Sequence, residues 1–188
     1  MMIEEWTGTE ISIESAVGII NALEKDFGFT RGPVLRSTYN ALNELLLNVR
    51  HHAYPSELGV VDCFWKISLV KREDKLIHII VEDHGISIPA SMFEKIKSYK
   101  LDAHGVNYSD TELINKAVKM SEVSQFNGRG MGFKSILMDV DKGYINSFFI
   151  TSRNGYFEYS PVSNGSSENK FRYFNGTKIE IIISGEVQ

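Results

Sequence analysis

The segment from Leu35 to Tyr54, LRSTYNALNELLLNVRHHAY, constrains the fold of this chain more than any other. Its apolar residues recur at steps of three and four, the spacing that places side chains on one side of an α-helix. They are Leu35, Leu42, Leu45, Leu46, Val49 and Ala53. Pro55 follows and closes the pattern. The segment therefore predicts one long helix that packs its apolar side against a core.

A polar stripe crosses the same helix. Asn40, Glu44, Asn48 and His52 are spaced by four residues, so their side chains stack on one face. A carboxylate is costly to bury without a partner, so a polar stripe among leucines needs a reason. The helix alone leaves two explanations open: this face is simply solvated, or it carries a functional site.

The composition is that of a globular protein and argues against some functions. The 188 residues fit one domain, 1–188, with enough length for a core. A formal net charge of −4 and a pI near 5.8 argue against a general nucleic-acid surface, so no direct nucleic-acid binding is expected. The single cysteine, Cys63, rules out an internal disulfide and fits a reducing compartment. Because its neighbours are apolar, we expect Cys63 to be a small core residue.

No association with a membrane is expected. No apolar run approaches the ~20 residues that span a bilayer. The first residues, MMIEEWTGTE, are acidic and polar and lack the basic and apolar parts of a secretory signal. The expected location is the cytoplasm.

The remaining segments predict an α+β fold. Helices are expected at 12–27, 91–99, 109–123 and from 131 to about 140, and the third opens with Ser109 and Glu112 at capping-box spacing. Strands are expected at 63–71, 75–82, 144–151, 156–160, 170–175 and 178–184, with 1–10 as a lead-in or edge strand. The charged turn 72–74 and the Asn154-Gly155 turn predict hairpins between the strands that they join. The long polar segment 90–127 is expected to cover a site rather than to form core. This order predicts a two-layer α/β sandwich, with helices on one face of a mostly antiparallel mixed sheet.

The glycine cluster Gly128, Gly130 and Gly132 is the first candidate for a ligand site. Alternate glycines let the backbone approach a ligand, and the helix that follows would point its N–H groups at an anion such as phosphate. The dinucleotide-binding fingerprint is absent, and Phe133 stands where a P-loop requires glycine. A glycine-rich turn without a ligand remains the alternative.

Asp83 and the Glu44/Asn48 pair are further candidates. Asp83 ends an apolar strand, where a carboxylate needs a donor, and Gly85 would let the chain turn under a flat ligand. A plain Asx turn closed by Pro89 is the alternative. The amide oxygen of Asn48 suits Mg²⁺, and Glu44 could orient or deprotonate a water or a hydroxyl.

Together these motifs resemble a known family. In order, the chain reads E-x-x-x-N on a helix, a strand ending in D-x-G, a long polar segment, G-x-G-x-G before a helix, and Gly-Thr before a last strand. This order resembles the ATP-binding domain of the GHKL superfamily (gyrase, heat-shock chaperone, histidine kinase and MutL), which has the Bergerat fold. The resemblance spans about Leu35 to Ser184. It implies an N-box at 40–54, an aspartate box at 81–89, an ATP lid at 90–127, a glycine box at 128–133 and a Gly-Thr pair at 176–177.

The resemblance implies a site for ATP and Mg²⁺. Asn48 matches the Mg²⁺ ligand, and Glu44 the general base of members that hydrolyse ATP or phosphorylate serine. Asp83 matches the residue that accepts the adenine amino hydrogen, Gly85 the glycine beneath the ring, and Thr177 the threonine that supports the adenine pocket. The rest of the implied nucleotide site is His51 or His52, Ile88, Gly128, Arg129, Gly130, Met131, Gly132, Phe133 and Lys134.

Within that set, the three glycines would cradle the phosphates, and Arg129 and Lys134 would add positive charge. His51 or His52 lies where many relatives place a basic residue near the phosphates. The two histidines are adjacent in the helix and point about 100° apart, so joint binding of one metal is not expected.

One departure from the family pattern concerns Ser87. The family usually has D-x-G-x-G-I-P, and here the second glycine is replaced, giving DHGISIP. A serine with an ordinary backbone could alter how the lid starts or how tightly a nucleotide binds.

The chain is similar to small stand-alone members of this family, the bacterial anti-sigma-factor serine kinases and the ATP-binding proteins that pair with a STAS-like partner. The resemblance implies a regulatory ATP·Mg²⁺-binding protein in which Glu44 activates a serine of a partner protein. The partner would be a sigma factor, an anti-anti-sigma factor or a STAS-like protein, and a homodimer is compatible with it. An ATP-dependent binding switch, or a slow ATPase without kinase activity, is the alternative.

Overall fold

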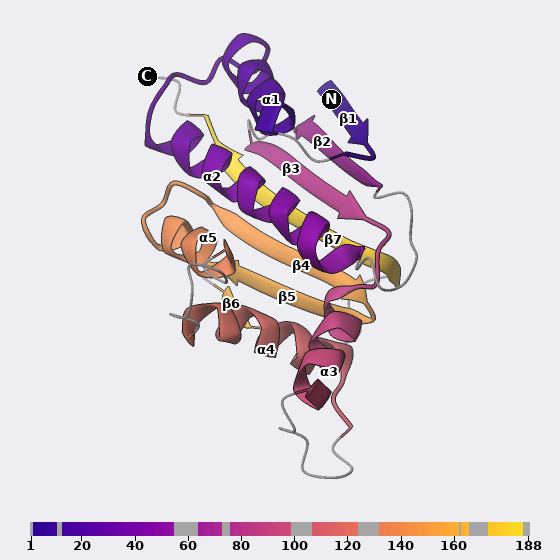
Figure 1. Ribbon diagram of the computed structural model, residues 1–188. Coiled ribbons are helices and arrows are strands. Elements are labelled where there is room, and N and C mark those ends of the chain that lie inside the picture. The colour runs from indigo at the N-terminus through magenta and orange to yellow at the C-terminus, as the bar shows by residue number, and fades with distance from the viewer. Residues whose placement is uncertain are drawn as a thin grey trace.

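Figure 1 shows the computed structural model of the chain. The structure describes residues 2–10, 13–54, 64–72, 76–98, 107–123, 132–161, 163–165 and 173–185. One antiparallel sheet and a layer of helices form an open α+β arrangement. Cys63 lies outside the described residues, so its expected place in the core stays a prediction.

The sheet contains seven strands in the described part of the chain, in the order β1-β2-β3-β7-β4-β5-β6. They are β1 Met2–Gly8, β2 Trp65–Lys71, β3 Leu76–Asp83, β4 Ser147–Arg153, β5 Gly155–Ser160, β6 Ser163–Gly165 and β7 Phe174–Ser184. β1 is an edge strand, and the predicted hairpins β2-β3 and β4-β5 are confirmed. Every pair among these strands is antiparallel, so the expectation of a mixed sheet is wrong for the described residues.

The last strand also differs from the prediction. The sequence predicts two strands separated at Gly176-Thr177, whereas β7 runs without a break from Phe174 to Ser184. Gly176 keeps a positive φ of 111° inside it, and Thr177 pairs with both β3 and β4. β3 pairs with β7 only from Thr177 onward, and the register between β4 and β7 shifts between Ser152 and Arg153. The predicted turn is therefore a local irregularity at Gly176 within one strand.

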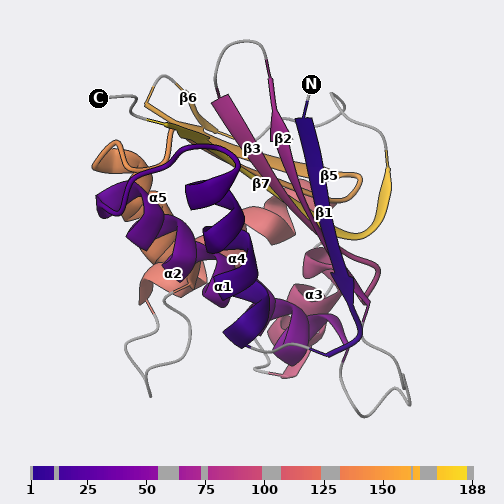
Figure 2. The same cartoon turned by 90° about the horizontal axis from the view of Figure 1, so that it is seen from above.

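The helices gather on one side of the sheet, as the view from above shows (Figure 2). They are α1 Ile13–Lys25, α2 Pro33–Asn48, the π-helical turn η1 Val49–Ala53, α3 Ile88–Ser98, α4 Asp110–Val123 and α5 Gly132–Asp141. The predicted helices are thus confirmed in place, and they lie on one face as predicted. Within the described ranges, none of them has the length and the apolar character needed to cross a membrane.

Helix α4 belongs to the core. The sequence predicted the whole segment 90–127 as a cover over a site, and this is wrong for α4. Its start is the predicted capping box, since the Ser109 N–H donates to Glu112 Oε2 (2.8 Å) and the Glu112 N–H donates to Ser109 Oγ (3.3 Å). Ile114 and Val118, one turn apart, are buried in the main hydrophobic cluster. Part of the segment 90–127 therefore stabilises the sandwich itself.

Alternation along the central strands brings polar residues to the inner face at one end of the sheet. Val81 of β3 and Ile179 of β7 are buried beneath the helices. The next inward positions are Asp83 and Thr177, which pair with each other across the two strands. The outer face carries ion pairs instead, such as Lys178–Glu82 at 3.2 Å. Two polar residues at inward positions mark this end of the sheet as a candidate site.

Candidate functional site

A cavity of about 190 Å³ lies between this end of the sheet and the helices above it. Its polar lining residues are Asn48, His52, Asp83, Ser87, Ser91, Lys95 and Thr177. Its other lining residues are Leu45, Val49, Ala53, Val81, Ile88, Met92, Ala117, Gly132, Phe133 and Ile179. Apolar walls with a few polar groups are typical of sites for small organic ligands.

Seven of the predicted site residues line this one cavity. They are Asn48, His52, Asp83, Ile88, Gly132, Phe133 and Thr177. Glu44, His51, Gly85 and Lys134 are described by the structure but are not among the lining residues. The predicted residues Gly128, Arg129, Gly130 and Met131 lie outside the described residues. The sequence motifs, far apart along the chain, therefore converge on one place.

Helix α2 and the turn after it position Asn48 and His52. α2 starts with Pro33 in its first turn and buries its apolar side, as predicted. Directly after Asn48 the helix widens into the π-helical turn η1. Such turns are rare and are frequently found at functional sites. Of the two candidate histidines, His52 lines the cavity and His51 does not.

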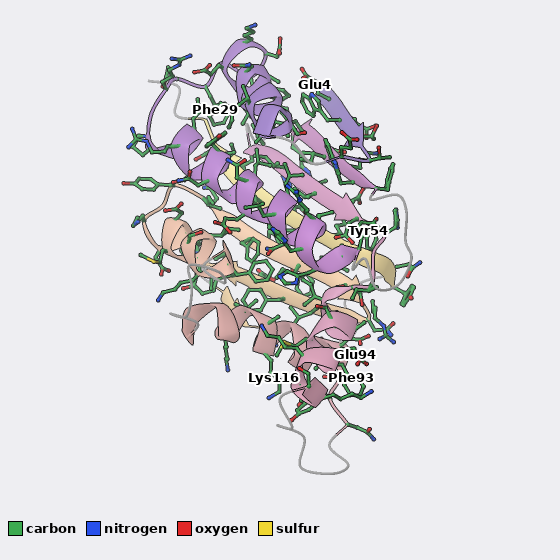
Figure 3. The ribbon with its side chains drawn as sticks, viewed as in Figure 1. Glu4, Phe29, Tyr54, Phe93, Glu94 and Lys116 are labelled. Atoms are coloured by element: carbon green, nitrogen blue, oxygen red, sulfur yellow. The ribbon has the colours of Figure 1, made fainter. Side chains whose placement is uncertain are left out.

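Tyr54 connects the end of η1 to the strand ends, and Figure 3 labels it there. Its hydroxyl donates to the carbonyl oxygen of Phe64 (2.8 Å) and accepts from the N–H of His84 (3.1 Å). The backbone N–H of Ile86 donates to Ala53 O (2.8 Å). These bonds hold the π-helical turn against the loop that follows Asp83.

Glu44 lies one turn before Asn48 and beside the start of α5. A Cβ atom placed on Gly132 would be 3.0 Å from Glu44 Oε2 and 3.5 Å from Asn48 Nδ2. The first residue of α5 therefore lies against both side chains because it is a glycine. Glu44, Asn48 and the N-terminus of α5 form one end of the candidate site, where the N–H groups of the helix favour an anion.

Asp83 lies at the buried end of the cavity, beside Thr177. Its side chain is 5% exposed, and Oδ1 accepts from the N–H of Gly85 at 2.9 Å. Burial raises the pKa of Asp83 to about 6, although the backbone N–H groups of Gly85 and Thr177 and the nearby His84 oppose the shift. The Asx turn that the sequence suggested as an alternative is present, and the same carboxyl group also lines the cavity.

Gly85 has a steric role that the sequence does not reveal. A Cβ atom at this position would overlap Ala53 O and lie 2.5 Å from Ala53 Cβ. The missing side chain therefore lets the loop after Asp83 pack on η1. The family role of Gly85 beneath a ligand ring stays a prediction.

Replacing Gly85 by alanine is expected to destabilise the protein by more than about 2 kcal/mol, because the new methyl group overlaps the backbone of Ala53. Gly18→Ala is the matched control. Gly18 lies within α1, and a Cβ atom there would come no closer than 3.9 Å to a neighbour, Trp6 Nε1. This control is expected to stabilise by roughly 0.5–1 kcal/mol. Urea unfolding of both variants measures the two effects, and equal effects would contradict the packing of Gly85 on η1.

Ser87 adopts a glycine-like backbone. Its φ is +74°, a left-handed conformation that disfavours a Cβ atom by roughly 1–2 kcal/mol. Its buried hydroxyl accepts from the N–H of Ala90 (3.3 Å), in the first turn of α3. The sequence alone suggested that Ser87 could have an ordinary backbone conformation, and the structure shows that it does not. The conformation is the one a glycine would take, and the hydroxyl adds a cap to α3.

Thr177 is held beside Asp83 by a buried hydrogen-bond network. A Cβ atom at Gly176 would overlap Asp83 O, so this position before Thr177 requires a residue without a side chain. The φ of Gly176 is also positive. Ser152 of β4 lies 3.3 Å from Thr177, oxygen to oxygen, and donates to Gly176 O at 2.6 Å. The N–H of Ile88 donates to the same Ser152 oxygen at 3.2 Å.

Positive charge reaches the cavity through Lys95. This residue follows Ser91 by one turn of α3, and both line the cavity. Burial lowers the pKa of His52, and the positive charges of Lys95 and His51 lower it further. The cavity lining thus combines a lysine, an imidazole whose pKa is lowered and the carboxyl group of Asp83.

Sequence reasoning missed Ser152 and Lys95. Ser152 could have been found from the alternation of β4, because Phe148 and Ile150 are buried on the inner face and position 152 comes next on that face. Lys95 gives a weaker signal, since only its helical spacing from Ile88 and Ser91 places it on the cavity side of α3.

The donor set fits a magnesium ion held together with phosphates and not a metal held by protein alone. Within the described residues, no group of three or more His, Cys, Asp or Glu side chains could hold a metal ion. Mg²⁺ keeps several waters and often takes only one or two protein oxygens when phosphates supply the others. The amide oxygen of Asn48 at the cavity wall can supply such a ligand.

A scan of the chain against protein-family models finds no match, and a search of curated proteins finds none either.

Proposed function

We propose that this protein binds ATP with Mg²⁺ in the cavity between α2, α3, α5 and the inner face of the sheet, and that its fold is the Bergerat fold of the GHKL superfamily. The observation that carries the proposal is the convergence of Asn48, Asp83, Gly132 and Thr177 on one cavity from four separate segments. A chance resemblance between motifs would not require these residues to meet.

The chemistry of the two ends supports a nucleotide. Asp83 and Thr177 lie at the buried end between apolar walls such as Val81 and Ile179, which suit a flat base. The carboxylate of Asp83 would accept an amino hydrogen of adenine. At the other end, Asn48, Lys95 and the start of α5 offer an amide oxygen, a cation and helix N–H groups to phosphates.

Glu44 is the residue for a catalytic step. Its carboxylate lies beside Gly132 and one turn from Asn48, so it could accept the proton of a serine hydroxyl or of a water. Bound Mg²⁺ would neutralise charge on the phosphates. We propose an anti-sigma-type serine kinase that acts in the cytoplasm on a regulatory partner protein: a sigma factor, an anti-anti-sigma factor or a STAS-like protein.

The second candidate is an ATP-dependent binding switch, or a slow ATPase, without kinase activity. The observation in its favour is that Glu44 is not among the residues that line the cavity. In that case Glu44 would only position a water, and partner binding would follow nucleotide occupancy alone.

Calorimetric titration with ATP, with and without Mg²⁺, tests the proposal. We expect one site per chain, with binding at least about tenfold tighter when Mg²⁺ is present. Asn48→Ala should lose most of this dependence on Mg²⁺. Asn40→Ala is the matched control, because Asn40 lies two turns earlier on the same helix and is exposed. Wild-type protein without measurable ATP binding would contradict the proposal.

A further inference from the structure

Ser152 is the most enclosed polar residue near the cavity. Its side chain is 0% exposed at an inward position of β4. Its oxygen contacts three groups from other segments: the carbonyl of Gly176 at 2.6 Å, the hydroxyl of Thr177 at 3.3 Å and the N–H of Ile88 at 3.2 Å. Two of these residues, Thr177 and Ile88, line the cavity, whereas Ser152 does not.

The direction of each bond follows from the number of protons available. A carbonyl only accepts, so the single hydroxyl proton of Ser152 is committed to Gly176 O, the shortest of the three contacts. The N–H of Ile88 only donates, and it occupies one acceptor position of the Ser152 oxygen. The contact between Ser152 and Thr177 therefore needs the proton of Thr177.

This assignment determines what Thr177 offers to a ligand. Once its proton points to Ser152, the Thr177 oxygen has only lone pairs left for the cavity. Asp83, paired with Thr177 across β3 and β7, is a carboxylate that likewise accepts when ionised. The buried end of the cavity then holds two acceptors side by side, and a ligand that brings a further acceptor there leaves buried polar groups unpaired.

We infer that Ser152 is a specificity-determining residue: by taking the proton of Thr177, it makes the buried end of the cavity accept hydrogen bonds only, and so selects a base that carries an exocyclic amino group. This inference rests on the proposed function. Ser152 acts through Thr177 and Ile88 and is thus a positioning residue.

A purely structural role of Ser152 and a role in specificity differ in their effect on the preference between nucleotides. If Ser152 only stabilised the fold, Ser152→Ala would weaken every nucleotide by the same factor. If it sets the direction of the Thr177 hydroxyl, its loss frees that hydroxyl to donate to a ring nitrogen of the base. Ligands without the amino group should then recover affinity relative to ATP.

The test compares the Kd of ATP with that of purine riboside triphosphate, which has the same ring nitrogens and lacks only the amino group. Wild type is expected to prefer ATP by roughly 10- to 100-fold. In Ser152→Ala this preference should fall by about fivefold or more. Thr151→Ala is the control, because the side chain of Thr151 lies on the outer face of β4, away from the cavity, and the preference should be unchanged.

Thr177→Val tests the same inference without a substitution at Ser152, through the same preference for ATP over purine riboside triphosphate. Removing the hydroxyl should reduce the preference to a similar extent, and adding Ser152→Ala to Thr177→Val should reduce it no further. An unchanged preference in either single variant, or equal weakening of both nucleotides in Ser152→Ala, would overturn the inference and leave ATP binding intact. Failure of wild type to bind ATP would overturn the proposed function together with it.

Discussion

Asp83→Asn is expected to abolish ATP binding and at the same time to stabilise the folded protein. Asparagine retains an oxygen for the Gly85 N–H, but its uncharged amide replaces the carboxylate that would accept the adenine amino hydrogen. The affinity for ATP should therefore fall at least about 100-fold. Stability should rise because the buried carboxylate is costly when ionised. Its pKa moves from 3.8 to about 6 on folding, which corresponds to at most about 3 kcal/mol at pH 7.5.

The pH dependence of this stabilisation has a definite sign. A carboxyl group whose pKa is raised by folding favours the folded state below pH 3.8, and this contribution is lost as the pH rises through about 6. The difference in unfolding free energy between Asp83→Asn and wild type should therefore be largest at pH 7.5 and shrink towards pH 4.5. Urea unfolding at both values measures it.

Asp110→Asn serves as the control. Asp110 accepts from the N–H of Asn154 (3.1 Å) and lies 3.7 Å from the guanidinium of Arg153. Both contacts stabilise its negative charge in the folded state. This variant should not be stabilised at pH 7.5. An Asp83→Asn protein that is less stable than wild type at pH 7.5 would show that the apo cavity does not penalise the charge of Asp83.

Glu44→Gln is expected to separate chemistry from binding. The side chain keeps its size beside Gly132 but can no longer accept a proton. Phosphoryl transfer or ATP hydrolysis should fall roughly 10²–10⁴-fold, while the Kd of ATP changes by less than about threefold. Single-turnover release or transfer of labelled phosphate measures the first effect, and calorimetry the second.

Glu24→Gln is the matched control for Glu44→Gln. Glu24 lies in α1 and pairs with Arg31 at 2.8 Å, outside the cavity. Equal rates for wild type and Glu44→Gln, with ATP binding intact, would remove Glu44 from the mechanism and favour the binding switch.

The sequence predicts the local elements of this fold well because their signals are local. The helix from Leu35 and the hairpin at Asn154-Gly155 follow from hydrophobic spacing and turn chemistry, and both are present. The continuity of β7 could not be predicted in the same way. Gly176-Thr177 is a typical turn signal, and only the pairing of Thr177 with both β3 and β4 shows that the strand continues past it.

Site residues were predicted where the residue type itself indicates a function. They were missed where their role depends on how distant segments pack. Asp83 was found because a carboxylate at the end of an apolar strand needs a donor, and Asn48 because it lies in a polar stripe among leucines. Thr177 was found only through the resemblance to the GHKL superfamily. No residue pattern predicts the π-helical turn after Asn48. Both histidines lie in this turn, and only His52 lines the cavity. The glycine at position 85 was noticed, but its contact with Ala53 depends on the packing of two distant segments.

A backbone-amide NMR titration of the wild-type chain with ATP and Mg²⁺ tests the central claim most directly. The account predicts saturable shifts, at one nucleotide per chain, for the amides of Asn48, Gly85, Ile88, Gly132 and Thr177, which lie in or beside the cavity. Amides of β1, at the edge of the sheet, should stay unchanged. Absence of shifts around the cavity, or saturable shifts confined to another surface, would contradict it.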